Sequence, residues 1–116
     1  MNVQKRADAK DLRDHGRVIL AHGEIFGHCH EVIETSASDH GVPAMDFFEE
    51  PDGRRILLVT RPCLLRHDEH DPIALDPTTP IEVRQGDVLL LPIGDGAWEV
   101  RRQVEYQPDV IRQVAD

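Results

Sequence analysis

Five of the seven histidines in this 116-residue chain lie in two short clusters. The first cluster contains His22, His28 and His30, and the second contains His67 and His70. Neutral imidazole is the side chain that most commonly binds a divalent metal in proteins. The chain has no phosphate-binding loop, no GxGxxG, no CxxC and no serine nucleophile elbow. The histidines are therefore the strongest indication of chemistry, and they predict a metal site.

The spacing in the first cluster favours a shared strand face. His28 and His30 are separated by one residue, so in a β-strand both side chains lie on the same face. Glu34 follows four residues later and has the same parity. Ligands of these types suit a divalent transition metal such as zinc, iron, nickel or manganese. The alternative is that the two histidines face solvent or make structural hydrogen bonds at the end of a barrel.

The other histidines are candidates to complete the metal shell. Gly23 and Gly27 allow a sharp turn that would return His22 to the pair. His67 and His70 are three residues apart, so both reach one site only if a turn intervenes. His67 is slightly favoured because it ends an apolar strand. The alternative for each of the three is an ordinary loop histidine.

Two carboxylates are candidate catalytic residues, Glu24 and Glu69. If the protein is an enzyme, the metal would activate water or polarise a substrate oxygen, and one of these groups would be the general base. Either one is alternatively a surface carboxylate, so enzyme activity stays open. The rival hypotheses are a non-enzymatic module that binds a protein or small molecule without metal, and a pH-responsive assembly element. In the last case, clustered histidines gain charge together between about pH 5 and 7.

Composition indicates one compact domain over residues 1–116. The chain is 40% hydrophobic and has no apolar run of 18 residues, so we expect no membrane partner. Its formal charge of −9 repels nucleic-acid phosphates. The N-terminus lacks the apolar stretch of a signal peptide, and two cysteines are too few for a disulfide framework. We therefore expect a cytoplasmic protein whose partner is an unknown small molecule or protein.

Glycines and prolines divide the chain into short segments, which is typical of an all-β barrel or sandwich. Residues 1–15 form a polar arm or contain a short helix, and residues 107–116 form a short C-terminal helix. The apolar runs 56–59 and 88–91 predict strands buried on both faces. Cys29 and Cys63 are expected in the core. Strands are expected near Arg17–Ala21, Cys29–Thr35, Ala44–Phe48, Arg54–Thr60, Cys63–Arg66, Ile73–Leu75, Ile81–Arg84, Asp87–Pro92 and Trp98–Tyr106.

Two motifs resemble those of cupins, which are small β-barrels. The first is HxHxxxE beginning at His28, and the second is GxxxxxPxG beginning at Gly86. The resemblance implies a cupin-like barrel in which the two histidines and the glutamate of the first motif bind metal. The family's fourth ligand falls at Ala97 and is missing here, so His67 or His70 would have to replace it.

Three longer blocks resemble a family of small uncharacterised bacterial and phage proteins. They are Gly16–Glu24 with the histidines that follow it, Leu65–Leu75, and Glu99–Asp116. The resemblance implies that the two histidine blocks belong together. In that family a strand like Arg84–Leu90 opens the chain, whereas here it comes late. The strand is either permuted or duplicated, or it is exchanged between the subunits of a homodimer.

Overall fold

The structure, a computed structural model, describes residues 3–22, 29–35 and 44–102. This part of the chain is all-β, and no helix in it is long and apolar enough to cross a membrane. The predicted C-terminal helix over residues 107–116 lies outside the described residues. The strands are β1 (Lys10–Asp11), β2 (Val18–His22), β3 (Cys29–Glu34), β4 (Met45–Glu49), β5 (Arg55–Val59), β6 (Cys63–His67), β7 (His70–Leu75), β8 (Val83–Gln85), β9 (Val88–Gly94) and β10 (Ala97–Arg102).

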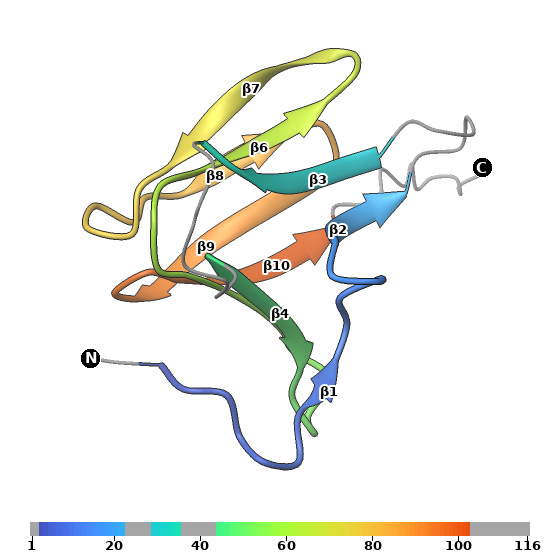
Figure 1. Cartoon of the computed structure of the whole chain (residues 1–116), viewed down its shortest axis with the longest axis vertical. Coiled ribbons are helices and arrows are strands. Elements are labelled where there is room, and N and C mark those ends of the chain that lie inside the picture. The colour runs from blue at the N-terminus through green and yellow to red at the C-terminus, as the bar shows by residue number, and fades with distance from the viewer. Residues whose placement is uncertain (1–2, 23–28, 36–43, 103–116) are drawn as a thin grey trace, which may run out of the picture.

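The described strands form two antiparallel sheets. One has six strands in the order β1-β4-β5-β10-β9-β8, and the other has four in the order β2-β3-β6-β7 (Figure 1). At the borders between the sheets, β7 lies near β8 and β2 lies near β4. Within the described residues no strand of one sheet pairs with a strand of the other, so the sheets form a sandwich and not a closed barrel. The late strand β9 lies between β8 and β10 of its own chain.

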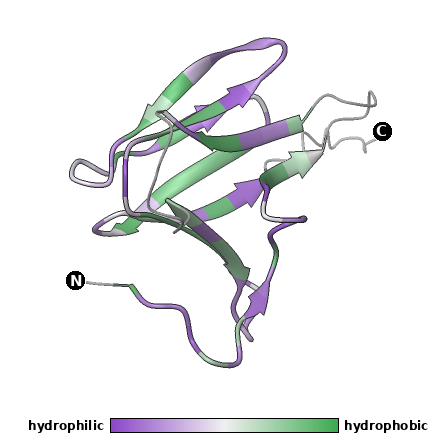
Figure 2. Ribbon diagram, in the orientation of Figure 1, coloured by the Kyte–Doolittle hydropathy of each residue, from purple (hydrophilic) through white to green (hydrophobic). Residues whose placement is uncertain are grey.

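One hydrophobic core joins the inner faces of the sheets. Trp98 and Phe47 are its largest members from the six-stranded sheet, and Leu65 and Val32 face them from the four-stranded sheet. The two continuous apolar runs form β5 and β9, which are interior strands of the larger sheet. The ribbon of β9 is mostly hydrophobic, whereas hydrophobic and hydrophilic residues alternate along β10 (Figure 2). The prediction that these two runs are buried strands is confirmed, because most of their residues are buried.

The N-terminal segment is not helical. Lys10 and Asp11 instead form β1, which extends the six-stranded sheet by pairing with β4. The side chain of Arg13 donates hydrogen bonds to Asp11, at 3.0 Å from its Nε to Oδ1. These bonds lower the pKa of Asp11 to about 2. The edge of β4 offers unpaired backbone N–H and C=O groups, and pairing with them is more favourable than a short helix in this charged stretch.

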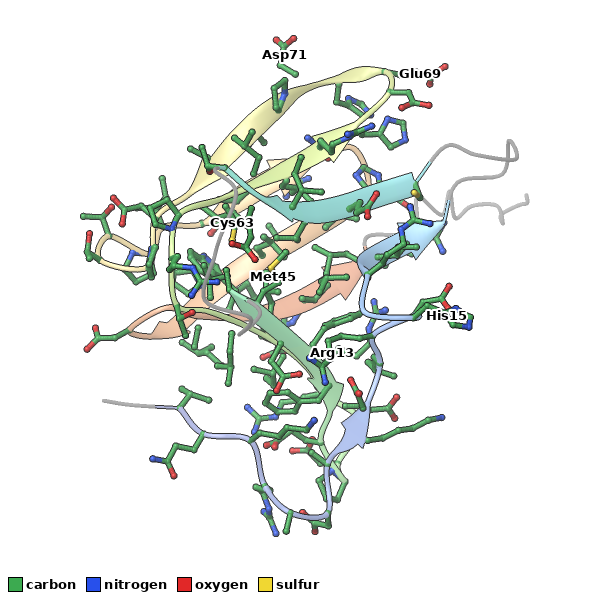
Figure 3. The ribbon with its side chains drawn as sticks, viewed as in Figure 1. Arg13, His15, Met45, Cys63, Glu69 and Asp71 are labelled. Carbon is green, nitrogen blue, oxygen red and sulfur yellow. The ribbon has the colours of Figure 1, made fainter. Side chains whose placement is uncertain are left out.

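The two cysteines differ in their surroundings. Cys63 is fully buried, and its thiol lies between the sheets beside Met45, with the two sulfur atoms 3.9 Å apart (Figure 3). The expectation of a core position is confirmed for Cys63. Cys29 is only partly buried, because on β3 the inner face belongs to the parity of His30 and Val32. The expectation that Cys29 packs into the core is therefore wrong.

Candidate metal centre

Three histidine rings meet at one end of the sandwich. His30 comes from β3, His67 from the end of β6 and His70 from the start of β7. The ring centroids of His30 and His67 are 4.4 Å apart, those of His67 and His70 are 4.8 Å apart, and those of His30 and His70 are 5.9 Å apart. These three residues are called the histidine cluster below. The structure thus brings one residue of the first sequence block together with both histidines of the second.

A tight turn explains why His67 and His70 reach the same site. The two residues pair directly across the β6–β7 hairpin, and only Asp68 and Glu69 lie between them. Because of their three-residue spacing, a turn between His67 and His70 was needed for both to reach one site, and the structure contains this turn. His30 joins them because β3 pairs with β6 in the same sheet, with Glu31 opposite Arg66.

A buried glutamine determines how the His30 ring is oriented. Gln85, which is 3% exposed at the end of β8, donates from its Nε2 to the carbonyls of Leu65 at 3.1 Å and Asp71 at 3.0 Å. With its NH₂ group used in this way, Gln85 turns its Oε1 to the Nδ1 of His30, 2.9 Å away. An amide oxygen can only accept, so Nδ1 of His30 must carry the proton. In the neutral ring, the lone pair is then on Nε2.

The turn after β8 allows two imidazole nitrogens to approach one point. Gly86 has a φ of 61° at the first position of the two-residue β8–β9 turn, a conformation that favours glycine. A Cβ atom at this position would lie 3.0 Å from Nε2 of His70 and 3.4 Å from Nε2 of His30. The absence of a side chain on Gly86 therefore leaves room for both imidazole rings beside this turn.

The second residue of the same turn brings a carboxylate to His30. Oδ1 of Asp87 lies 3.3 Å from Nε2 of His30, and its Oδ2 accepts a hydrogen bond of 2.7 Å from Nε of Arg102 on β10. Partial burial acts to raise the pKa of Asp87, but the hydrogen bond from Arg102 and its charge outweigh this effect and lower the pKa. Asp87 is therefore an ionised group beside the histidine cluster at neutral pH.

His67 has the opposite tautomer to His30. The backbone N–H of Glu69 donates to Nδ1 of His67 at 3.0 Å, so in the neutral ring the proton is on Nε2. His70 is exposed, and its Nε2 is the atom nearest to the Cβ position of Gly86. Nε2 of His70 therefore lies beside the β8–β9 turn, as Nε2 of His30 does. Which of His67 and His70 would bind a metal stays a prediction.

Glu34 is not part of the cluster. It has the parity of His30, as predicted, but four residues along a strand span about 13 Å. Its carboxylate instead lies 3.2 Å from Nη2 of Arg61 and accepts the backbone N–H of Ala44 at 3.3 Å. The expectation that Glu34 and His30 bind one metal is corrected. The two side chains lie on the same face of β3, but they are too far apart along the strand to share an ion.

The remaining predicted residues are placed only in part. The backbone of His22 ends β2 opposite Cys29, whereas Glu24 and His28 lie outside the described residues, so their roles stay predictions. Glu69 is exposed at the tip of the β6–β7 hairpin (Figure 3). Within the described ranges, no group of three or more His, Cys, Asp or Glu side chains has an arrangement that could hold a metal ion.

Sequence analysis missed Gln85, Asp87 and Arg102. The available signal was the glycine of the second cupin-like motif, since Gly86 lies between the first two of these residues. That motif drew attention instead to Ala97, which is fully buried on β10.

Comparison with known proteins gives a family and no function. No curated protein and no solved structure matches the chain significantly. The family model of a domain of unknown function, DUF8820, matches residues 1–79. The matched region contains all three residues of the histidine cluster, and Gln85 and Asp87 follow it. The chain belongs to the DUF8820 family of domains of unknown function.

Proposed function

We propose that this protein binds a divalent transition metal through its histidine cluster, with Nε2 of His30 and Nε2 of His70 as ligands. The observation that carries the proposal is that both atoms lie within 3.4 Å of the position that a Cβ atom on Gly86 would take. Zinc, iron, nickel and manganese are all compatible with imidazole ligands. His22, His28 and His67 are candidates for further ligands.

The hydrogen bond between His30 and Gln85 supports this proposal. Histidines that bind metals almost always donate their other ring N–H to a protein acceptor, which fixes the tautomer and the orientation of the ring. His30 does this with Nδ1, and Gln85 is itself held by two backbone carbonyls.

The character of the chain is consistent with a metal-binding protein of the cytoplasm. The net charge of −9 attracts cations to its surface. Cys29 and Cys63 are both free thiols, which suits a reducing compartment.

Titration of metal-free protein with zinc, followed by calorimetry, tests the proposal. We expect one zinc ion per chain, and at least tenfold weaker binding in His70→Ala. His70 is exposed, so this variant should fold normally, as circular dichroism can verify. The matched control is His15→Asn, because His15 is exposed in a distant turn and asparagine tolerates its positive φ of 53°.

Two results would count against the proposal. Wild-type protein that binds no zinc, iron, nickel or manganese would favour the non-enzymatic interaction module. Equal affinities in wild type, His70→Ala and His15→Asn would show that metal binds elsewhere.

A further inference from the structure

We infer that the N-terminal arm, residues 3–12, exchanges between two copies of this chain and so forms a symmetric dimer. In the structure the arm lies on β4 of its own chain, at one end of the molecule (Figure 1). In the dimer, each arm lies on β4 of the other copy and makes the same contacts there. The inference concerns a different surface from the histidine cluster and does not depend on the proposed function.

Backbone pairing with β4 holds the arm. The two residues of β1 pair with Phe48 and Glu49, and the N–H of Leu12 donates to the carbonyl of Phe47 at 2.9 Å. β1 is short, and both of its residues are exposed. The β4 edge of a second copy offers the same backbone groups, so this pairing can form equally well between two chains.

The arm also covers an apolar residue on the outer face of the six-stranded sheet. Phe47 packs into the core, so its neighbour Phe48 points to the opposite face. Phe48 is nevertheless fully buried, and the ammonium of Lys5 lies 5.7 Å from the centroid of its ring. The same ammonium lies 3.7 Å from the carboxylate of Asp46 on β4. Removal of the arm would uncover Phe48, which favours an arm on every β4, from the same chain or from another.

The turn that connects the arm to β2 is strained. Asp14 and Arg17 exchange backbone hydrogen bonds of 2.8 and 2.9 Å around the hinge turn, in which His15 and Gly16 have φ values of 53° and 83°. A two-residue type I′ turn requires such values, but they are unfavourable for a residue with a Cβ atom. The side chain of His15 is 95% exposed and points away from the sheets (Figure 3), so packing does not compensate for this strain.

Exchange removes the strain and keeps the contacts of the arm. When the hinge turn opens, residues 13–17 become extended and span up to about 17 Å toward a second copy. Both hinge turns open in a two-fold dimer, so the strain is relieved twice. Short hinges under strain are known to favour exchange of a terminal segment.

Variants of the hinge turn test the inference through the dissociation constant of the dimer, measured by size-exclusion chromatography with light scattering. Gly16→Ala adds strain to the closed turn without crowding, because its Cβ would meet nothing within 4 Å. We expect its dimer to dissociate at least about tenfold less readily than that of wild type. His15→Gly removes strain and should weaken the dimer. Gly53→Ala is the matched control, since Gly53 has a φ of 93° and equally open surroundings but lies outside the hinge turn.

Disulfide trapping shows on which chain each arm lies. Lys10 and Glu49 are register partners, at a Cα separation of about 4.5–5.5 Å that a disulfide can bridge. We expect oxidation of mixed Lys10→Cys and Glu49→Cys chains, both also carrying Cys29→Ser, to give a covalent heterodimer. Lys10→Cys mixed with Glu82→Cys should give none, because Glu82 is exposed beside β8 at the opposite edge of the sheet. Fluorescence of the single tryptophan, Trp98, verifies that each variant is folded.

Three results would overturn the inference. The first is the absence of a heterodimer from mixed Lys10→Cys and Glu49→Cys chains, when one chain with both substitutions closes the bridge within itself. The second is a dimer with equal dissociation constants in wild type, Gly16→Ala and His15→Gly, since it would use another surface. The third is a Gly16→Ala variant that stays monomeric at every concentration. A heterodimer whose yield rises with concentration and with Gly16→Ala would support the exchange.

Discussion

A single residue, Gln85, links the two sheets. Its side chain leaves β8 of the six-stranded sheet and binds one carbonyl on β6 and one on β7, as well as His30 on β3. Each hydrogen bond contributes about 0.5–1.5 kcal/mol, and a buried partner left unsatisfied costs more. Gln85 therefore contributes to the stability of the fold as well as to the orientation of the site.

Replacement of Gln85 by leucine should destabilise the protein. We expect Gln85→Leu to lower the free energy of unfolding by about 2–4 kcal/mol, because two buried groups and one partly buried carbonyl lose their partner. Urea unfolding followed by Trp98 fluorescence measures the change. The exposed control Glu82→Leu should change it by no more than about 0.5 kcal/mol. Equal effects of the two substitutions would contradict the role given to Gln85.

The two thiols should differ in reactivity. Burial, aided by the charge of Glu34, raises the pKa of Cys63 to about 11, and the thiolate is the reactive form. At pH 8 we expect a disulfide reagent to modify one thiol per folded chain rapidly, and this thiol should disappear in Cys29→Ser. The second should react only in denaturant. Rapid reaction of both in the folded protein would show that Cys63 is accessible.

The tight turns are the elements that build the site. The β6–β7 turn places His67 and His70 side by side, and the β8–β9 turn presents Gly86 and Asp87 to them. Gly86 and Gly53 both have positive φ, of 61° and 93°. Only Gly86 faces histidine atoms, because a Cβ on Gly53 would meet nothing within 4 Å. A substitution at Gly53 therefore tests the cost of backbone strain alone, whereas one at Gly86 tests this strain together with crowding of the histidines.

We expect Gly53→Ala to cost about 1–2 kcal/mol from backbone strain alone. Gly86→Ala should cost more, since its Cβ would lie 3.0 Å from Nε2 of His70 and 3.2 Å from Cε1 of His30. Only Gly86→Ala should also weaken metal binding. Chemical denaturation and zinc titration of both variants measure these effects. Equal losses of affinity in the two variants would rule out a local effect at the cluster.

Most strands could be predicted because their signals are local. Alternating and continuous apolar residues predicted all of the described strands except β1, within a few residues of their observed bounds. The predicted end of the last strand, at Tyr106, lies outside the described residues. β7 was expected to begin at Ile73, directly after Pro72, but it begins at His70. Proline is tolerated there because β7 is an edge strand, where a missing N–H need not break the ladder. β1 was missed because the strand with which it pairs, β4, is distant in the sequence.

At the scale of the whole molecule, the site depends on contacts between distant segments. His30 and Gln85 are 55 positions apart in the chain and belong to different sheets. Strand parity correctly placed His30 and Glu34 on one face, but it contains no information about which residues of another sheet lie opposite each of them. Sequence analysis therefore found the histidines but not their supporting glutamine and aspartate.

An ion pair in each of the two sheets predicts loss of stability in acid. Hydrogen bonds from Arg13 and Arg17 lower the pKa of Asp11 and Glu31, respectively, from ordinary values of 3.8 and 4.5. The folded state then binds fewer protons than the unfolded state in this range, so the stabilisation is complete above about pH 5 and is lost as the pH falls through the folded pKa values. We expect the free energy of unfolding to fall between pH 5 and 3.

Urea denaturation at several pH values measures this dependence. Glu31→Gln should show a smaller fall than wild type, whereas the exposed control Glu82→Gln should follow the wild type. Salt should reduce the effect, because both pairs are accessible to solvent. A stability that does not change between pH 5 and 3 would contradict the assignment of these ion pairs.

The most direct test of the metal centre is elemental analysis of untagged protein purified without chelator or nickel resin. We predict about one equivalent of a transition metal per chain, lost in the His30→Ala, His70→Ala double variant and retained in His15→Asn. A wild-type protein without metal, which also takes up none from added zinc, iron, nickel or manganese, would contradict the proposed function.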